Sequence, residues 1–103
     1  MAINKKYSKD GSICHVTFIL PKEVSENFTH VNLVGNFNNW DIHKDKFSHN
    51  SPDGSFSAEY NLNAGKEYQF RYLGDGQVWL NEPDADRQVL THFGDSKNSI
   101  LVI

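Results

Sequence analysis

The chain has 103 residues, a hydrophobic content of 38% and a net charge of −3 at pH 7. This length accommodates one domain with a single core, but not a core and a deep catalytic cleft as well. The acidic balance argues against a nucleic-acid partner or an anionic membrane, because both require a concentrated basic surface. The single cysteine cannot form an internal disulfide, and we expect a cytoplasmic protein without a signal peptide or a membrane span.

The predicted elements are short strands separated by turns. Residues 1–12 are polar, and we expect them to form a flexible lead-in to a single module that spans residues 13–103. Apolar and polar side chains alternate over residues 13–20, which predicts a strand whose core-facing positions are Cys14, Val16, Phe18 and Leu20. A cysteine on the apolar face of a strand is typical of a small buried hydrophobic residue rather than of a nucleophile or a metal ligand.

The other strands are predicted from the same alternation. We expect them at residues 29–35, 55–62, 67–73, 77–80 and 100–103. A short turn containing Gly65 joins residues 55–62 to residues 67–73, so these two strands are predicted to pair as an antiparallel hairpin. Residues 74–76 should form the turn of a second hairpin, which leads to residues 77–80.

The remaining segments are predicted to be connections. They are a polar connection at residues 22–27, an irregular segment at 41–48 anchored by Phe47, a turn at 51–54 and a long loop at 81–93. No segment longer than about six residues has helical periodicity, and turn residues recur every 8 to 12 residues or so. This pattern predicts an all-β fold, an antiparallel β-sandwich of the immunoglobulin-like kind.

One stretch, residues 31–40, differs from an ordinary strand and turn. It reads V-N-L-V-G-N-F-N-N-W, and three asparagines lie in the five residues before Trp40. Asparagine side chains hydrogen-bond to nearby backbone and tolerate left-handed conformations, so this segment is predicted to be an ordered loop. The loop should place Trp40 at the rim of a strand, held by a local polar network.

Four short motifs, taken together, resemble a known family. They are G-N-F-N-N-W at residues 35–40, Y-Q-F-R-Y at 68–72, D-G-Q-V-W at 75–79 and N-S-I at 98–100. In this order and at this spacing they resemble carbohydrate-binding module family 48, the glycogen- and starch-binding module of isoamylases, glycogen-branching enzymes and the β subunit of AMP-activated protein kinase. The resemblance covers residues 13–103 and implies an immunoglobulin-like sandwich that binds α-1,4-glucan without catalysis.

The resemblance also implies which residues bind the glucan. Trp40 and Trp79 match the two family tryptophans that stack on glucose rings, and Asn98 matches an asparagine that hydrogen-bonds to sugar hydroxyls. Arg71 stands where the kinase-type module has a lysine, which keeps a cationic donor but makes it planar and forked. Taken alone, these residues also have structural interpretations. The tryptophans could pack in the core, Arg71 could form a surface charge pair, and Asn98 could open a strand.

The sequence departs from the kinase-type pattern after the second tryptophan. Val78 is an extra residue before Trp79, and another extra residue falls between Gly94 and Asn98. Phe93 takes the place of a leucine that would rest against a glucose ring, and either Asp95 or Ser96 takes the place of a nearby threonine. We expect Phe93 and Ser96 to belong to the glucan site, with the details of this loop altered.

Residues 80–87, L-N-E-P-D-A-D-R, resemble a W-x-N-D-P-x-A-D stretch in modules attached to bacterial debranching and branching enzymes. We interpret this stretch as structural, with its asparagine and proline shaping a loop and its carboxylates solvated.

The residues do not indicate an enzyme, a metal or a cofactor. Glycosidases need two carboxylates facing each other across a cleft, and Asp84 and Asp86 lie in a domain with no room for a deep one. The histidines at positions 15, 30, 43, 49 and 92 are scattered without a nucleophile motif, and their spacing suits no compact zinc site. No glycine loop of the phosphate-cradling kind is present.

Two hypotheses for the function follow. The leading one is non-catalytic binding of an α-glucan in a shallow surface groove. The alternative is a docking module for a partner protein, with a vestigial glucan site and an interface made by the apolar second face of residues 13–19 and the exposed strand edges. The protein partner that the resemblance implies is a glycogen-metabolising enzyme or a kinase subunit.

Overall fold

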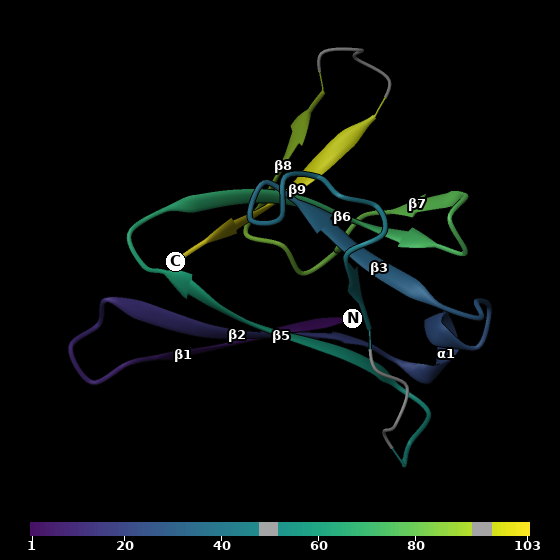
Figure 1. Cartoon of the computed structure of the whole chain (residues 1–103), viewed down its shortest axis with the longest axis horizontal. Coiled ribbons are helices and arrows are strands. Elements are labelled where there is room, and N and C mark those ends of the chain that lie inside the picture. The colour runs from purple at the N-terminus through teal and green to yellow at the C-terminus, as the bar shows by residue number, and fades with distance from the viewer. Residues whose placement is uncertain (48–51, 92–95) are drawn as a thin grey trace.

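The chain folds into two antiparallel sheets that pack face to face. The computed structural model describes residues 1–47, 52–91 and 96–103. One sheet has the strand order β1-β2-β5, and the larger sheet has the order β4-β3-β6-β9-β8, with β7 paired to β6 (Figure 1). The strands are β1 (Ala2–Tyr7), β2 (Ile13–Leu20), β3 (Val31–Gly35), β4 (Asp45–Lys46), β5 (Phe56–Asn63), β6 (Glu67–Gly74), β7 (Val78–Leu80), β8 (Arg87–Leu90) and β9 (Lys97–Val102). This arrangement confirms the predicted all-β sandwich.

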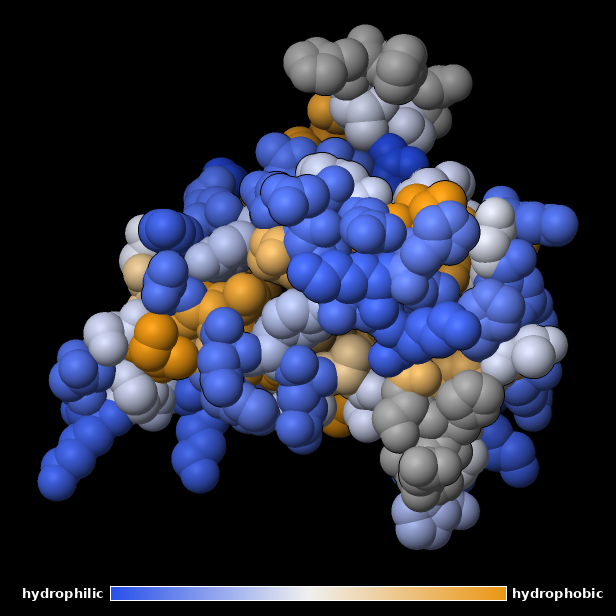
Figure 2. All heavy atoms as spheres, viewed as in Figure 1, coloured by the Kyte–Doolittle hydropathy of each residue, from blue (hydrophilic) through white to orange (hydrophobic). Residues whose placement is uncertain are grey.

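The core lies between the two sheets and is made by alternate residues of the facing strands. β2 contributes Cys14, Val16, Phe18 and Leu20, each with 0% exposure, as the alternation predicted. Phe18 packs edge-on against Phe70 of the larger sheet, with ring centroids 5.3 Å apart. Burying one such side chain contributes about 1.5–3 kcal/mol, so these rings hold the layers together. Outside the core, hydrophilic residues cover most of the face shown in Figure 2, and hydrophobic residues appear in separate patches.

The first residues of the chain form a strand rather than a flexible lead-in. β1 pairs antiparallel with β2, from Ala2 opposite Ile19 to Tyr7 opposite Cys14. The expectation for residues 1–12 is therefore wrong for residues 2–7. Edge strands pair on one side only and present polar side chains to water, so the apolar alternation that identifies a central strand is weak in them.

The turn between β1 and β2 is also ordered. Asp10 accepts hydrogen bonds from Ser12 N at 3.0 Å and from the hydroxyls of Ser12 and Ser8, both at 2.8 Å. These bonds, with the backbone bond first among them, lower the pKa of Asp10 to about 2. Gly11 adopts a φ of 76°, which lets the chain reverse directly after Asp10.

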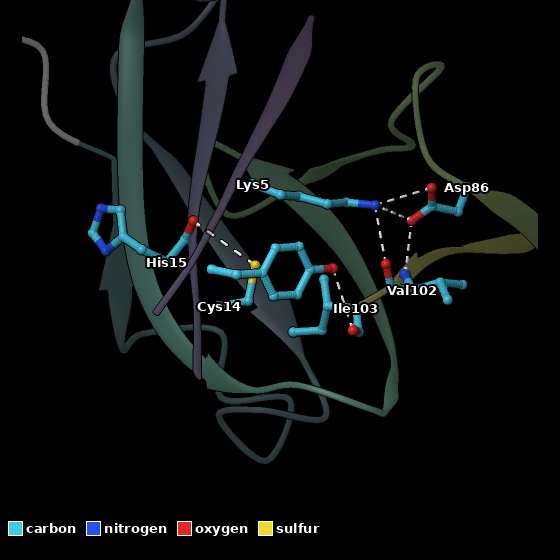
Figure 3. A network of polar contacts seen from close by, with 7 residues as sticks. Lys5, Cys14, His15, Asp86, Val102 and Ile103 are labelled. Atoms are coloured by element: carbon cyan, nitrogen blue, oxygen red, sulfur yellow. Dashed lines mark hydrogen bonds and ion pairs between the residues drawn. The ribbon is translucent and has the colours of Figure 1, made fainter. Parts of the chain in front are cut away.

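A group of polar contacts ties β1 to the opposite sheet. Lys5 Nζ donates to both carboxylate oxygens of Asp86, at 3.1 and 2.9 Å, and to Val102 O at 3.0 Å (Figure 3). Asp86 Oδ2 accepts a further bond from Val102 N at 2.7 Å, and the Tyr7 hydroxyl donates to Ile103 O at 3.3 Å. Partial burial raises the pKa of Asp86, but the hydrogen bonds from Lys5 and Val102 outweigh it, so this pKa lies below its usual value.

β5 and β6 do not form the predicted hairpin. β5 pairs with β2 in one sheet, whereas β6 lies between β3 and β9 in the other. Residues 64–66 therefore carry the chain from one layer to the other, at the side of the sandwich in Figure 1. A short glycine turn between two alternating strands is compatible with either arrangement, and the pattern alone did not distinguish them. The second predicted hairpin is confirmed, because β6 pairs with β7.

The expected long loop at residues 81–93 contains a further strand. β8 pairs with β9, with Leu90 opposite Lys97, and residues 92 and 93 lie outside the described residues. This edge strand lacks apolar alternation and is held by its backbone bonds, so the sequence did not reveal it. β9 likewise begins earlier than predicted. A short helix, α1 (Lys22–Ser25), and β4 lie in segments expected to be irregular, and residues 52–54 form the described part of the turn at 51–54.

Candidate functional site

The loop after β3 is held in place by one buried asparagine. Asn38 is 3% exposed, and its Oδ1 accepts a hydrogen bond from Gly35 N at 3.1 Å. Its Nδ2 donates to Leu33 O and to Asp45 Oδ2, both at 2.8 Å. Because a buried amide is stable only when its hydrogen bonds are made, these three bonds fix the path of the loop between β3 and β4. The sequence predicted an ordered asparagine loop but not which asparagine orders it.

The loop begins at a position that only glycine fits. A Cβ atom on Gly35 would lie 2.6 Å from Gln69 O and 2.9 Å from both the Phe37 ring and Phe70 Cβ. β3 and β6 therefore approach closely at this point. Gly35 O accepts a hydrogen bond from Trp40 N at 2.9 Å, which ties the backbone of Trp40 to the end of β3.

Trp40 is exposed on a strained backbone. Its φ is 56° and that of Asn39 is 58°, both in the left-handed region that a bulky residue rarely adopts. Its side chain is 37% exposed, although burial in the core would remove a large apolar area from water. Such strain persists where the surrounding contacts impose it, and it is frequent at functional sites. Trp40 is therefore presented at the surface rather than packed in the core.

Trp79 lies on the outer face of the larger sheet. It stands opposite Leu73 of β6, and Leu73 stands opposite Asn32 of β3. Its neighbour Leu80 packs against the core, so Trp79 points away from the core, and it is 46% exposed. Arg71 Cζ lies 5.8 Å from the centre of the Trp79 ring, within the range of a cation–π interaction.

Arg71 is the centre of a polar network on the same face. Its Nε donates to Asn98 Oδ1 at 2.6 Å, and its Nη2 donates to Ser96 Oγ at 3.0 Å. Asn98 Nδ2 donates in turn to Gln69 Oε1 at 3.0 Å, and Thr91 Oγ1 lies 2.9 Å from Ser96 Oγ. The partners of Arg71 in this network are neutral, unlike those of a surface charge pair. Because the side chains hold one another before a ligand arrives, less conformational entropy is lost on binding.

The structure brings four of the six predicted site residues into one group. Arg71, Trp79, Asn98 and Ser96 lie together across β6, β7 and β9, although they are distant in sequence. Trp40 lies in the loop after β3, which is also a neighbour of β6, and none of the contacts described above joins it to this group.

Two residues predicted for this region lie outside the described part of the chain, and one residue of the network was not predicted. Phe93 and Asp95 lie outside the described residues, so the expected contact of Phe93 with a sugar stays a prediction. Gln69 was missed, although it precedes Arg71 by two positions on a strand and the period of two places it on the same face. Beside it, a shallow hollow of about 320 Å³ is lined by Gln69, Val89, Leu90 and Thr91.

The loop between β7 and β8 contains a buried carboxylate. Glu82 has 0% exposure; its Oε1 accepts a hydrogen bond from the Tyr72 hydroxyl at 2.7 Å, and its Oε2 accepts one from Asp84 N at 2.9 Å. The expectation of solvated carboxylates in residues 80–87 is therefore wrong for Glu82, whereas Asp84 is exposed. Burial, together with the neighbouring Glu82, raises the pKa of Tyr72. This bond anchors the loop to the core, which is a structural role.

Other kinds of site are not evident in the part of the chain that the structure describes. Within residues 1–47, 52–91 and 96–103, no group of three or more His, Cys, Asp or Glu side chains is arranged to hold a metal ion. Cys14 is buried, and His15 points to the opposite face, where its Nδ1 lies 2.7 Å from Asn61 Oδ1. In the same ranges, no helix is long and apolar enough to span a bilayer.

Comparisons with known proteins give no family assignment. No protein-family model matches the chain, and no curated protein matches it either. What the resemblance of the four motifs implies about function is therefore a proposal.

Proposed function

We propose that the outer face of the larger sheet binds an α-1,4-glucan of the glycogen or starch type without catalysing a reaction. The observation that carries this proposal is an exposed tryptophan next to a pre-formed network of donors and acceptors. Trp79 is 46% exposed, and the Arg71 guanidinium lies over its ring while it is hydrogen-bonded to Asn98.

The chemistry of this face suits a neutral sugar chain. A glucose ring has C–H groups on its two faces and hydroxyls around its edge. The indole rings of Trp79 and Trp40 offer flat apolar platforms for the sugar faces. The guanidinium of Arg71 has more N–H donors than the two that the network uses, and the amide of Asn98 offers both a donor and an acceptor to neighbouring hydroxyls.

The affinity for short oligosaccharides should be modest. The face is open, so a bound sugar stays partly in water and few of its hydrogen bonds are buried. We therefore expect dissociation constants between micromolar and millimolar, which correspond to binding free energies of about −8 to −4 kcal/mol. Multiple contacts along a long glucan would then give firmer attachment to the polysaccharide than to a short piece of it.

Docking to a protein partner, such as a glycogen-metabolising enzyme or a kinase subunit, is the second candidate function. One observation favours it: Leu90, on the edge strand β8, is 64% exposed. The interface first expected, on the second face of β2, is less suitable. Ile13 and Ile19 are only partly buried there, but His15 and Thr17 lie between them on this face, and Thr17 is flanked by Asn4 and Glu59 in the adjacent strands. This mixed face gives no continuous apolar surface.

The test is binding to glycogen or starch granules, followed by titration with maltoheptaose while tryptophan fluorescence is recorded. We expect binding with a fluorescence change, and a loss of affinity of at least about tenfold in each of Trp79→Ala and Trp40→Ala, since each change removes one stacking platform. Tyr7→Ala is the matched control, because Tyr7 is 48% exposed and lies on the other sheet. No binding at millimolar sugar by the folded protein would refute the proposal.

A further inference from the structure

A pocket rich in hydrogen-bond donors lies on the outer face of the larger sheet. It has a volume of about 300 Å³ and is lined by His30, Asn32, Ile42, His43, Lys46 and Gly76. None of these described lining residues is a carboxylate, and three of them can carry positive charge. Lys46 is charged at pH 7, His30 and His43 each add a positive charge when protonated, and Asp75 Oδ1 lies 3.7 Å from His30 Nδ1.

The donor pocket is continuous with the glucan face. Lys46 stands opposite Asn32, Asn32 opposite Leu73, and Leu73 opposite Trp79, so these four residues form one row across β4, β3, β6 and β7. Residues paired in this way share a face of the sheet. Because neighbouring strands lie about 4.8 Å apart, Asn32 is about 10 Å from Trp79 across the sheet. A glucan stacked on Trp79 would therefore reach the donor pocket with a neighbouring sugar.

Asn32 is an unusual residue for its position. It is 3% exposed, and its Nδ2 has no hydrogen-bond partner among the described residues. An unpaired buried donor costs about 1–3 kcal/mol, and native proteins contain few of them. Asparagine is also a poor strand former, so an aliphatic residue in the middle of β3 would stabilise the fold more. A ligand that accepts a hydrogen bond from the amide would account for the asparagine.

Two aspartate side chains hold the backbone around the donor pocket. Asp75 Oδ1 accepts bonds from Thr29 N at 2.9 Å and from His30 N at 3.0 Å, and it lies 3.7 Å from His30 Nδ1. On the other side, Asp41 Oδ1 accepts a bond from His43 N at 2.9 Å. The donors are therefore placed by ordered turns, which lowers the entropy lost when an anion binds.

We infer that the donor pocket is an oxyanion subsite of the glucan face, and that it takes a phosphate monoester carried by a sugar of the chain. This inference rests on the proposed function. A phosphate monoester has three acceptor oxygens and a charge of about −1.5 to −2 at pH 7, which suits the Lys46 amine, two imidazoles and the Asn32 amide better than the two oxygens of a carboxylate. The substrate class is then a phosphorylated α-glucan, and the neutral glucan is a weaker ligand of the same face.

The test compares a maltooligosaccharide with the same oligosaccharide bearing one phosphate monoester, by calorimetric titration of the whole chain at low salt. We expect about tenfold tighter binding of the phosphorylated form, which corresponds to one or two charge-assisted hydrogen bonds, and a smaller difference at high salt. Equal affinity for the two would overturn the subsite and leave the glucan proposal intact. Failure of both to bind would overturn the glucan proposal and this inference with it.

Three variants locate the effect. Lys46→Gln and Asn32→Leu should each bring the two affinities close to equality, because each removes a hydrogen-bond donor that the phosphate would use. Asn32→Leu should also leave the fold as stable or more stable, which a merely structural role of the amide would not allow. Lys66→Gln, an identical charge change at the exposed turn before β6, should preserve the preference. A preference that survives Lys46→Gln and Asn32→Leu would refute the assignment.

A separate arm distinguishes a sugar phosphate from free phosphate. Inorganic phosphate alone should bind the donor pocket more weakly than the phosphorylated oligosaccharide, because it gains nothing from stacking on Trp79. If inorganic phosphate binds as tightly as the phosphorylated oligosaccharide, the site serves free phosphate and the inference fails.

Discussion

Replacement of Asn38 by alanine tests whether one buried side chain orders the loop that carries Trp40. The change removes three hydrogen bonds, to Gly35 N, Leu33 O and Asp45 Oδ2. Two of these partners are neutral, and each such bond contributes about 1 kcal/mol; the bond to the carboxylate contributes about 1.5 kcal/mol at the low end of its range. The sum predicts a loss of about 3.5 kcal/mol, a large part of the 5–15 kcal/mol that stabilises a typical domain.

Urea unfolding, followed by tryptophan fluorescence, measures this loss directly. With a slope of about 1.5 kcal/mol per molar urea, the midpoint should fall by about 2 M. Asn36→Ala is the matched control. Asn36 is exposed, and its Oδ1 accepts one hydrogen bond from Gln69 N at 3.2 Å, so its loss should be below about 1 kcal/mol. If Asn38→Ala is no less stable than Asn36→Ala, the loop is ordered by something else and the reasoning is refuted.

Two further predictions concern the close approach of the strands and the contact between the sheets. Gly35→Ala should destabilise the fold by about 2–3 kcal/mol, because the new Cβ meets the backbone of Gln69, which cannot move aside; a loss below about 1 kcal/mol in urea unfolding would contradict this. Lys5→Met should destabilise by up to about 1 kcal/mol at pH 7, since the contact between Lys5 and Asp86 is near the surface. The pKa of Asp86 is lowered in the folded protein. The stability that its ionised carboxylate contributes is therefore fully present above the unfolded pKa of about 3.9 and is lost as the pH falls through the lower folded pKa. The difference between wild type and Lys5→Met should thus shrink below about pH 4, and a difference that persists there would refute the pairing.

The candidate site was partly predictable because strand periodicity places residues on faces. Arg71 and Gln69 are two positions apart on β6, so their side chains lie on the same face of the strand. The D-G turn before Trp79 indicated a hairpin. Which residues meet Arg71 was not predictable from that pattern. Its contacts with Ser96 and Asn98 depend on the pairing of β6 with β9, between residues 25 and 27 positions apart in the chain. The donor pocket at Asn32 likewise depends on the register of β4 with β3.

The sequence by itself determined the all-β class, the core face of β2 and the hairpin of β6 with β7. Each of these follows from short-range patterns, namely alternation with a period of two and the conformational preferences of glycine and asparagine. Only the tertiary structure decided that β1 and β8 are strands, that β5 and β6 lie in different sheets, and that Glu82 is buried. Backbone ladders and sheet-to-sheet packing join residues far apart in the chain and are nearly indifferent to side-chain type at an edge, so no local pattern records them.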